Sequence, residues 1–191
     1  CYVQGTVEAN FRFIPQQVAG LAALGHSPTV EEWCRAKAGL VLVTGSSGSG
    51  KSTTLASMTQ TIATQRCANI VSMEDRIEFV YSQGHSLIHQ REVGSDTQSF
   101  AAALRSALRQ DADVIIVGEM RDEETIRTAM TAADTGHLVI GTLHTADAPG
   151  ALNRIFDSYP EERQRFVGAQ LASSLLGVVC QYLLPLQGKP G

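Results

Sequence analysis

The chain has 191 residues, of which 43% are hydrophobic, and it carries a formal net charge of −4. This composition is typical of a globular domain and excludes both intrinsic disorder and a strongly basic surface for nucleic acid. Because no apolar run approaches the roughly 18 residues of a membrane-spanning helix, we expect no insertion into a membrane.

The first 26 residues have little periodicity. Residues 6–13 alternate weakly between apolar and polar side chains and predict a terminal strand, and residues 20–28 have the composition of a linker. A helix is predicted to begin at Thr29, because Thr29 as N-cap and Glu32 three residues later form a capping-box pattern. We expect residues 27–191 to form the main domain.

Residues 39–65 carry the most specific pattern of the sequence. A short apolar run at residues 40–43 predicts a buried parallel strand, and residues 53–65 predict a helix. Between them the chain reads G-x-x-x-x-G-K-S. A glycine-rich loop between a strand and a helix is typical of a phosphate-binding loop. The residues predicted to bind a nucleotide are Gly45, Ser46, Ser47, Gly48, Ser49, Gly50, Lys51, Ser52 and Thr53.

The chemistry of phosphate binding accounts for the residue types in this loop. Glycines let successive backbone N–H groups turn toward one anion, and the following helix points the positive end of its dipole at the same place. Lys51 is long enough to reach the β- and γ-phosphates, and the Ser52 hydroxyl is a ligand for Mg²⁺. The loop therefore predicts a bound nucleotide together with Mg²⁺.

After this loop, apolar strands alternate with helices. Strands are predicted over residues 69–73, 113–117 and 137–144, with a short stretch at 86–90 as an arm of a hairpin. Helices are predicted over residues 97–109, 123–134, 147–156 and 161–184, the last with Pro160 at its first position. This alternation predicts an α/β fold with a mainly parallel sheet covered by helices on both faces. Arg105 and Arg109 share one helix, where a solvated surface and a phosphate or intersubunit role both stay open.

Polar side chains follow the predicted strands at the point where each strand ends. They are Glu74, Asp75, Glu78, Glu119, Thr142 and His144. Each residue alone is also compatible with an ordinary loop position. Because ligands of an open parallel sheet bind beyond the carboxyl ends of its strands, we expect these side chains to share one site.

Hydrolysis of a nucleotide needs a carboxylate near Mg²⁺ and a group that orients the attacking water. Glu119 follows an apolar strand, as a Walker-B carboxylate does, although Gly118 stands where aspartate is usual, and we expect it to reach Mg²⁺ through water. Glu78 and Glu74 compete for the activation of water. His144 is a candidate for contact with the γ-phosphate.

With these motifs the chain resembles the type II/IV secretion ATPase superfamily, and within it the retraction ATPases of type IV pili. Besides the phosphate loop, the resemblance rests on SMEDRIEF at 72–79, QREV at 90–93, AAALRSALRQD at 101–111, VGEMRD at 117–122 and TGHLVIGTLHT at 135–145. These motifs occur in the order and spacing of the family, and the resemblance extends from about residue 29 to residue 184.

The resemblance implies a RecA-like P-loop NTPase core that binds ATP or ADP and hydrolyses ATP with Mg²⁺. It implies catalytic roles for Lys51, for Glu78 as the base, for Glu119 as an atypical Walker-B glutamate, and for His144, which shares the family's His box with His137. Ser52 and Glu119 are the implied metal-side residues. It also implies a homo-hexameric ring at the cytoplasmic face of the inner membrane, acting on pilin through a platform protein. The four cysteines, without a C-x-x-C pair, argue against a zinc site or a disulfide framework and fit a reducing cytosol.

Several departures from the family pattern leave alternatives open. Arg76 stands where the family has proline. Residues 1–26 match only the tail of a PAS-like N-terminal domain and a linker, the chain begins with Cys1, and the last helices look cut short, so we expect a partial chain. No cysteine follows Leu184, which favours a retraction motor over an assembly motor. The alternatives are a related motor for pilus assembly, type II secretion or conjugation, a small P-loop kinase, and a nucleotide-binding regulatory subunit without turnover.

Overall fold

The computed structural model describes residues 2–3, 6–7, 14 and 17–184, and the statements below concern these residues. Near the N-terminus, β1 (Tyr2–Val3) and β2 (Thr6–Val7) pair antiparallel. The predicted terminal strand therefore begins at β2, and its residues 8–13 lie outside the described part. Within the described residues, no helix combines the length and the apolar character needed to span a bilayer.

A six-stranded parallel sheet forms the centre of the domain. Its strand order is β5-β4-β6-β7-β3-β8, and every neighbouring pair is parallel. The strands are β3 (Gly39–Gly45), β4 (Asn69–Glu74), β5 (Leu87–Glu92), β6 (Val114–Val117), β7 (Leu138–Leu143) and β8 (Leu175–Gln181). Since all six run the same way, their carboxyl ends meet at one edge of the sheet.

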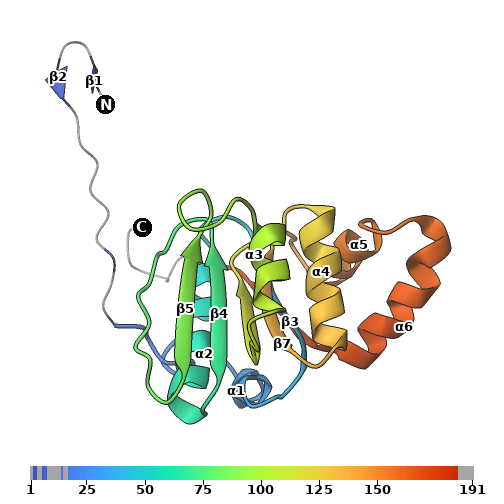
Figure 1. Cartoon of the computed structure of the whole chain (residues 1–191), viewed down its shortest axis with the longest axis horizontal. Coiled ribbons are helices and arrows are strands. Elements are labelled where there is room, and N and C mark those ends of the chain that lie inside the picture. The colour runs from blue at the N-terminus through green and yellow to red at the C-terminus, as the bar shows by residue number, and fades with distance from the viewer. Residues whose placement is uncertain (1, 4–5, 8–13, 15–16, 185–191) are drawn as a thin grey trace.

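Helices cover both faces of this sheet, as predicted. Behind β4 and β5 in Figure 1 lies α2 (Lys51–Gln65), on the same face as α1 (Pro28–Cys34). The other face carries α3 (Phe100–Ala107), α4 (Glu123–Asp134), α5 (Ala148–Phe156) and α6 (Gln164–Ser174). Along β3, Leu40 and Leu42 enter the core of this second face, while Val41 and Val43 enter the core beneath α1 and α2. This alternation is the two-residue period of a strand that is buried on both sides.

The predicted helix over residues 161–184 is wrong in its second half. A 3₁₀ turn at Glu161–Arg163 leads into α6, which ends at Ser174, and the chain then continues as β8 beside β3. The segment of β8 contains Gly177 and two consecutive valines, which are weak helix formers. Pairing with β3 supplies hydrogen bonds to a distant part of the chain, and these override the local apolar pattern.

Two smaller predictions are also corrected. The predicted hairpin arm at residues 86–90 belongs to β5, which is parallel to β4 and is reached through a crossover along α2. In this crossover the backbone N–H of His85 donates to the Ala63 carbonyl. The N-cap of α1 is Ser27 and not Thr29. Pro28 occupies the first helical position, where its fixed φ suits a helix and its missing N–H costs nothing.

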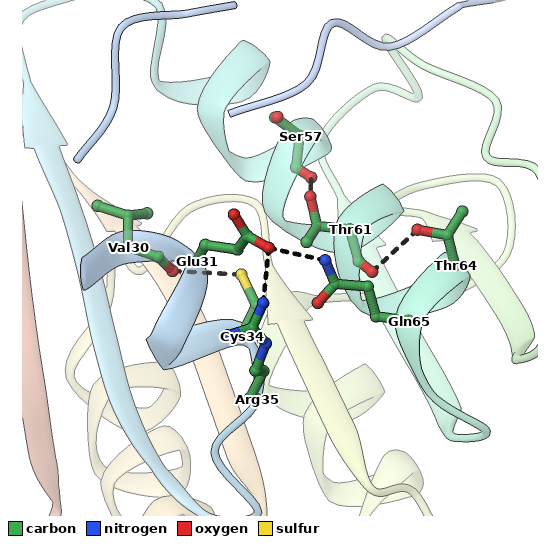
Figure 2. Close-up of polar contacts among 8 residues, drawn as sticks. All are labelled: Val30, Glu31, Cys34, Arg35, Ser57, Thr61, Thr64 and Gln65. Atoms are coloured by element: carbon green, nitrogen blue, oxygen red, sulfur yellow. Dashed lines mark hydrogen bonds and ion pairs between the residues drawn. The ribbon is translucent and has the colours of Figure 1, made fainter. Parts of the chain in front are cut away.

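Polar contacts join α1 to the carboxyl-terminal half of α2 (Figure 2). Glu31 accepts hydrogen bonds from Arg35, one turn later in α1, and from the Gln65 amide of α2, each at 2.8 Å. On the inner side of α1, the Cys34 thiol donates to the Val30 carbonyl at 3.4 Å and is almost fully buried. Burial raises the pKa of Cys34 to about 12.

We expect Cys34 to resist alkylation in the folded protein, whereas the exposed Cys67 reacts. With a pKa near 12, the Cys34 thiolate fraction at pH 8 is on the order of 10⁻⁴, and only the thiolate attacks. Peptide mapping by mass spectrometry after treatment with iodoacetamide measures both sites. In urea the two cysteines should react alike. Equal modification under native conditions would show that α1 does not cover Cys34 as described.

The indole ring of Trp33, the single tryptophan of the chain, packs so closely on β8 that residue 177 must be glycine. A Cβ built on Gly177 would lie 2.2 Å from two atoms of the indole ring. Gly177→Ala should therefore displace the ring, destabilise the fold by about 1–3 kcal/mol and shift the tryptophan fluorescence. The matched control is Gly168→Ala in α6, because its Cβ would meet only ordinary contacts at 3.8 Å. Identical unfolding curves and spectra for both variants would contradict this packing.

Candidate active site

A cavity of about 610 Å³ opens at the carboxyl edge of the sheet. Four segments contribute to it, and each follows a different strand. The residues that line the cavity are Ser47, Gly48, Gly50, Lys51, Ser52, Thr53 and Leu55 after β3, Glu74, Asp75, Arg76, Glu78 and Tyr81 at and after β4, Gly118, Glu119 and Arg121 after β6, and Thr142 and His144 at and after β7. Segments far apart in the sequence thus meet because parallel strands end together.

The loop from β3 to α2 depends on glycine at both of its ends. Gly50, the N-cap of α2, has φ 93°, a left-handed conformation that favours glycine. At the other end, a Cβ on Gly45 would lie 2.5 Å from the Gln181 carbonyl oxygen and from Ser49 Oγ. These conformations let the loop fold tightly over the amino end of α2, where backbone N–H groups and the helix dipole favour an anion.

Lys51 folds back onto its own loop. Its Nζ donates to the carbonyl oxygens of Gly45, at 2.9 Å, and Ser46, at 2.7 Å. Burial lowers the pKa of Lys51, and the charge of Glu119 opposes part of that shift. An ammonium group that is largely buried with only neutral acceptors is poised to exchange them for a charged phosphate.

Glu119 is at the centre of a small charged cluster. Its Oε1 lies 2.5 Å from the Arg121 Nε and 3.2 Å from the His144 Nε2, and the Glu119 side chain is only 14% exposed. Burial by itself would raise the pKa of Glu119, but the hydrogen bond from Arg121 and the charges of His144 and Arg121 outweigh it, so the pKa lies below its ordinary value. Glu119 is therefore an ionised carboxylate at neutral pH.

The position of this carboxylate follows from the close approach of β4 and β6. The Gly118 N–H donates to the Met73 carbonyl at 2.8 Å. A Cβ on Gly118 would lie 3.0 Å from the same oxygen and 3.1 Å from the Glu74 Cα. An aspartate at residue 118 would require the β4 backbone to shift by a few tenths of an ångström, whereas the next residue, Glu119, carries its carboxylate in the cavity.

The loop after β4 is held in place by side chains of the edge strand β5. The Gln90 amide accepts from the Tyr81 N–H at 3.2 Å and donates to the Phe79 carbonyl at 2.8 Å. It also donates to Glu74 at 3.1 Å, and Ser72 donates to the same carboxylate oxygen at 2.7 Å. Burial raises the pKa of Glu74, and these hydrogen bonds offset only part of that shift.

A second contact fixes the middle of this loop. Glu92 of β5 accepts from the Ile77 N–H at 3.0 Å, next to Glu78. Together with Gln90, this contact holds Glu78 at the wall of the cavity, where its side chain is half-buried. Two carboxylates with different surroundings, Glu74 and Glu78, therefore share one wall.

Most residues that the sequence singled out lie at this cavity. Three of the residues predicted to bind a nucleotide do not line it: Gly45 and Ser46 contribute the carbonyls that hold Lys51, and the Ser49 side chain is buried within the loop. His137 precedes β7, at the opposite edge of the sheet from His144, and its imidazole contacts the Ala132 carbonyl. Arg105 and Arg109 do not line the cavity, and Arg105 pairs with Glu124 of α4.

Arg121 and Tyr81 are among the cavity residues that were given no role from the sequence. Arg121 lies two residues after Glu119, so the spacing alone placed it near the site, but only the structure shows its ion pair. Tyr81 is buried, and its pKa is raised chiefly by that burial and further by the charge of Glu74. No local pattern identifies Tyr81, because it lies in an irregular loop.

Known proteins with a similar sequence or structure point to one family. A family model described as "Type II/IV secretion system protein" matches residues 12–189. The type IV pilus retraction ATPase PilT of Pseudomonas aeruginosa is 49% identical over 92% of this chain and 51% of its own length. A twitching motility protein of Neisseria gonorrhoeae is 51% identical over 92% of this chain and 47% of its own length.

A solved structure extends this similarity to the fold. The crystal structure of the pilus retraction motor PilT with bound ADP superimposes with a TM-score of 0.90 at 50% identity, covering 93% of this chain and 52% of that one. The chain thus spans about half the length of the relatives that it matches. With a family model that covers nearly all of its residues and relatives of this identity, the chain belongs to the type II/IV secretion system protein family.

Proposed function

We propose that this protein binds ATP at the β3–α2 loop and hydrolyses it to ADP and phosphate. The observation that carries the proposal is the single cavity that brings Lys51 together with Glu78, Glu119 and His144. An anion-binding loop, two carboxylates and an imidazole are the groups that hydrolysis of a triphosphate requires. The solved relative described with bound ADP supports an adenine nucleotide.

In this proposal the residues of the cavity bind the phosphates, orient the γ-phosphate and activate the attacking water. Backbone N–H groups of residues 46–51 and the Lys51 ammonium hold the phosphates, after Lys51 has left the carbonyls of its own loop. Glu78 accepts the proton of the attacking water. His144, which contacts Glu119, lies beside the γ-phosphate and stabilises the charge that develops there.

The side chains present also fit a bound Mg²⁺. The described residues contain no cluster of three His, Cys, Asp or Glu that would hold a metal without a nucleotide. Ser52 and Glu119 both line the cavity and offer oxygen donors, and Mg²⁺ is usually bound by one or two protein oxygens together with phosphates and waters. When bound, Mg²⁺ would neutralise charge on the phosphates, with Ser52 as a direct ligand and Glu119 as a ligand through water.

At the level of the cell, we infer a motor that powers retraction of type IV pili. The relatives that match more than nine tenths of this chain include proteins described as a pilus retraction ATPase and a twitching motility protein, which supports this choice over assembly or secretion. A homo-hexameric ring, a location in the cytoplasm at the inner membrane and a platform protein as partner belong to the same proposal. Residues 1–26 would be the tail of the domain that precedes the motor core.

Release of phosphate from ATP, with and without Mg²⁺, tests the enzymatic part. We expect hydrolysis that stops when Mg²⁺ is chelated. Transfer of the γ-phosphate to a small acceptor in place of water would indicate a kinase, and tight binding without turnover by the assembled protein would indicate a regulatory subunit. Restored twitching in a strain that lacks its own retraction motor tests the cellular role, and assembly of pili in place of retraction would contradict it.

A further inference from the structure

Arg121 is a cation of the cavity that is paired with a predicted catalytic carboxylate, Glu119. Its Nε lies 2.5 Å from Glu119 Oε1, and its side chain remains 59% exposed. The charge of Asp75, from the loop after β4, also acts on this guanidinium. Acidic residues of two loops thus act on one arginine that lines the cavity.

The backbone of Arg121 is fixed even though its side chain is exposed. Its carbonyl oxygen accepts a hydrogen bond from the Arg154 guanidinium of α5 at 2.6 Å. The next residue, Asp122, caps α4 by accepting from the Thr125 N–H at 2.8 Å. A guanidinium on such an anchored backbone can exchange partners by side-chain rotation, without any movement of the strands.

The pairing with Glu119 is of the kind that a phosphate can displace. The Glu119 carboxylate is largely buried, but the Arg121 guanidinium is open to water, so water and other acceptors compete for its hydrogen bonds. A terminal phosphate carries more charge and three acceptor oxygens, and the planar guanidinium binds such groups through two parallel hydrogen bonds. In the proposed binding mode, the loop holds the inner phosphates, and the γ-phosphate, which ADP lacks, is the terminal group available to Arg121.

We propose that Arg121 distinguishes ATP from ADP. Without a γ-phosphate it stays with Glu119; when ATP binds, it transfers to the γ-phosphate and leaves Glu119 to contact His144 and the water around the phosphates. Arg121 is therefore a specificity-determining residue within the same chain. This inference rests on the proposed function, because it requires a nucleotide on the β3–α2 loop.

Calorimetric titration of ADP and of a non-hydrolysable ATP analogue tests this role. In Arg121→Gln we expect the affinity for the analogue to fall roughly tenfold or more, the usual effect of losing a charged hydrogen bond. The affinity for ADP should stay within about twofold of the original protein. Arg121→Lys, which keeps the charge but not the fork, should lose part of the preference for the analogue. The matched control is Arg105→Gln, which removes a similarly exposed arginine paired outside the cavity and should change neither affinity.

Equal loss of affinity for both nucleotides in Arg121→Gln, or no loss for either, would overturn the sensing role. If Arg121→Gln does not fold, the Arg121→Lys variant tests the proposal instead. A full preference for the triphosphate in Arg121→Lys would contradict the use of the two parallel hydrogen bonds of the guanidinium. Lys51→Ala distinguishes this failure from failure of the proposed function. If Lys51→Ala binds both nucleotides normally, the loop is not the nucleotide site at all.

Discussion

Replacement of Lys51 by alanine is expected to weaken the binding of ADP and of ATP by about a hundredfold or more. Lys51 is the cation at the centre of the β3–α2 loop, and its Nζ can exchange two neutral carbonyl partners for charged phosphate oxygens. Charge-assisted hydrogen bonds of this kind contribute about 1.5–3 kcal/mol each, and each 1.4 kcal/mol is a factor of ten in affinity. Titration calorimetry with ADP measures the loss without requiring turnover.

Lys51→Ala should reduce the stability of the fold much less than it reduces the affinity for nucleotide. Lys51 donates only to its own loop, so the sheet and its two cores are not directly affected. Lys51→Arg is a useful control, because it keeps the positive charge but is bulkier and presents a planar group in a tight loop. If Lys51→Ala kept its nucleotide affinity while its unfolding temperature fell, Lys51 would be a structural residue and the loop would lose its assigned role.

Glu78→Gln is expected to bind ATP normally and to hydrolyse it on the order of a hundredfold more slowly, or worse. General bases typically contribute factors of 10²–10⁴ to a rate, and glutamine keeps the size of the side chain but accepts no proton. Single-turnover measurements with radiolabelled ATP separate the chemical step from binding and product release. The Michaelis constant should change little, since the proposed role of Glu78 is to act on water and not on the nucleotide.

Glu74→Gln is the matched comparison for the second carboxylate on the same wall. The Glu74 carboxylate is held by Ser72 and Gln90, and burial raises its pKa, so we infer that Glu74 mainly supports the loop that carries Glu78. We therefore expect a smaller loss of turnover, accompanied by a measurable loss of stability. A larger loss of turnover in Glu74→Gln than in Glu78→Gln would transfer the role of base to Glu74.

The local sequence predicts those elements whose pattern lies within one contiguous stretch of the chain. The strand β3, its glycine loop and α2 are specified by a contiguous motif in which each residue type has a chemical reason. The parallel sheet follows from apolar strands that alternate with helices, and the convergence of Glu74, Glu78, Glu119 and His144 follows from the parallel direction of those strands. These predictions need no knowledge of contacts between distant residues.

The missed features depend on such distant contacts. The apolar run of β8 suits either a buried helix or a strand, and its pairing with β3 decides between them. The direction of β5 depends on a crossover along α2, and no turn motif in the sequence predicts this crossover. Similarly, the pairing of Arg121 with Glu119 and the support of residues 75–81 by Gln90 are side-chain contacts between loops or strands, which depend on the folded geometry.

A crystal structure of the protein with a non-hydrolysable ATP analogue and Mg²⁺ tests the central claim most directly. We expect the β- and γ-phosphates at hydrogen-bonding distance, about 2.7–3.1 Å, from Lys51 Nζ and from the N–H groups of its loop, with Glu78, Glu119 and His144 around the γ-phosphate. A nucleotide bound elsewhere, or Lys51 still donating to Gly45 and Ser46 with the analogue present, would contradict the assignment of this cavity as the site of ATP hydrolysis.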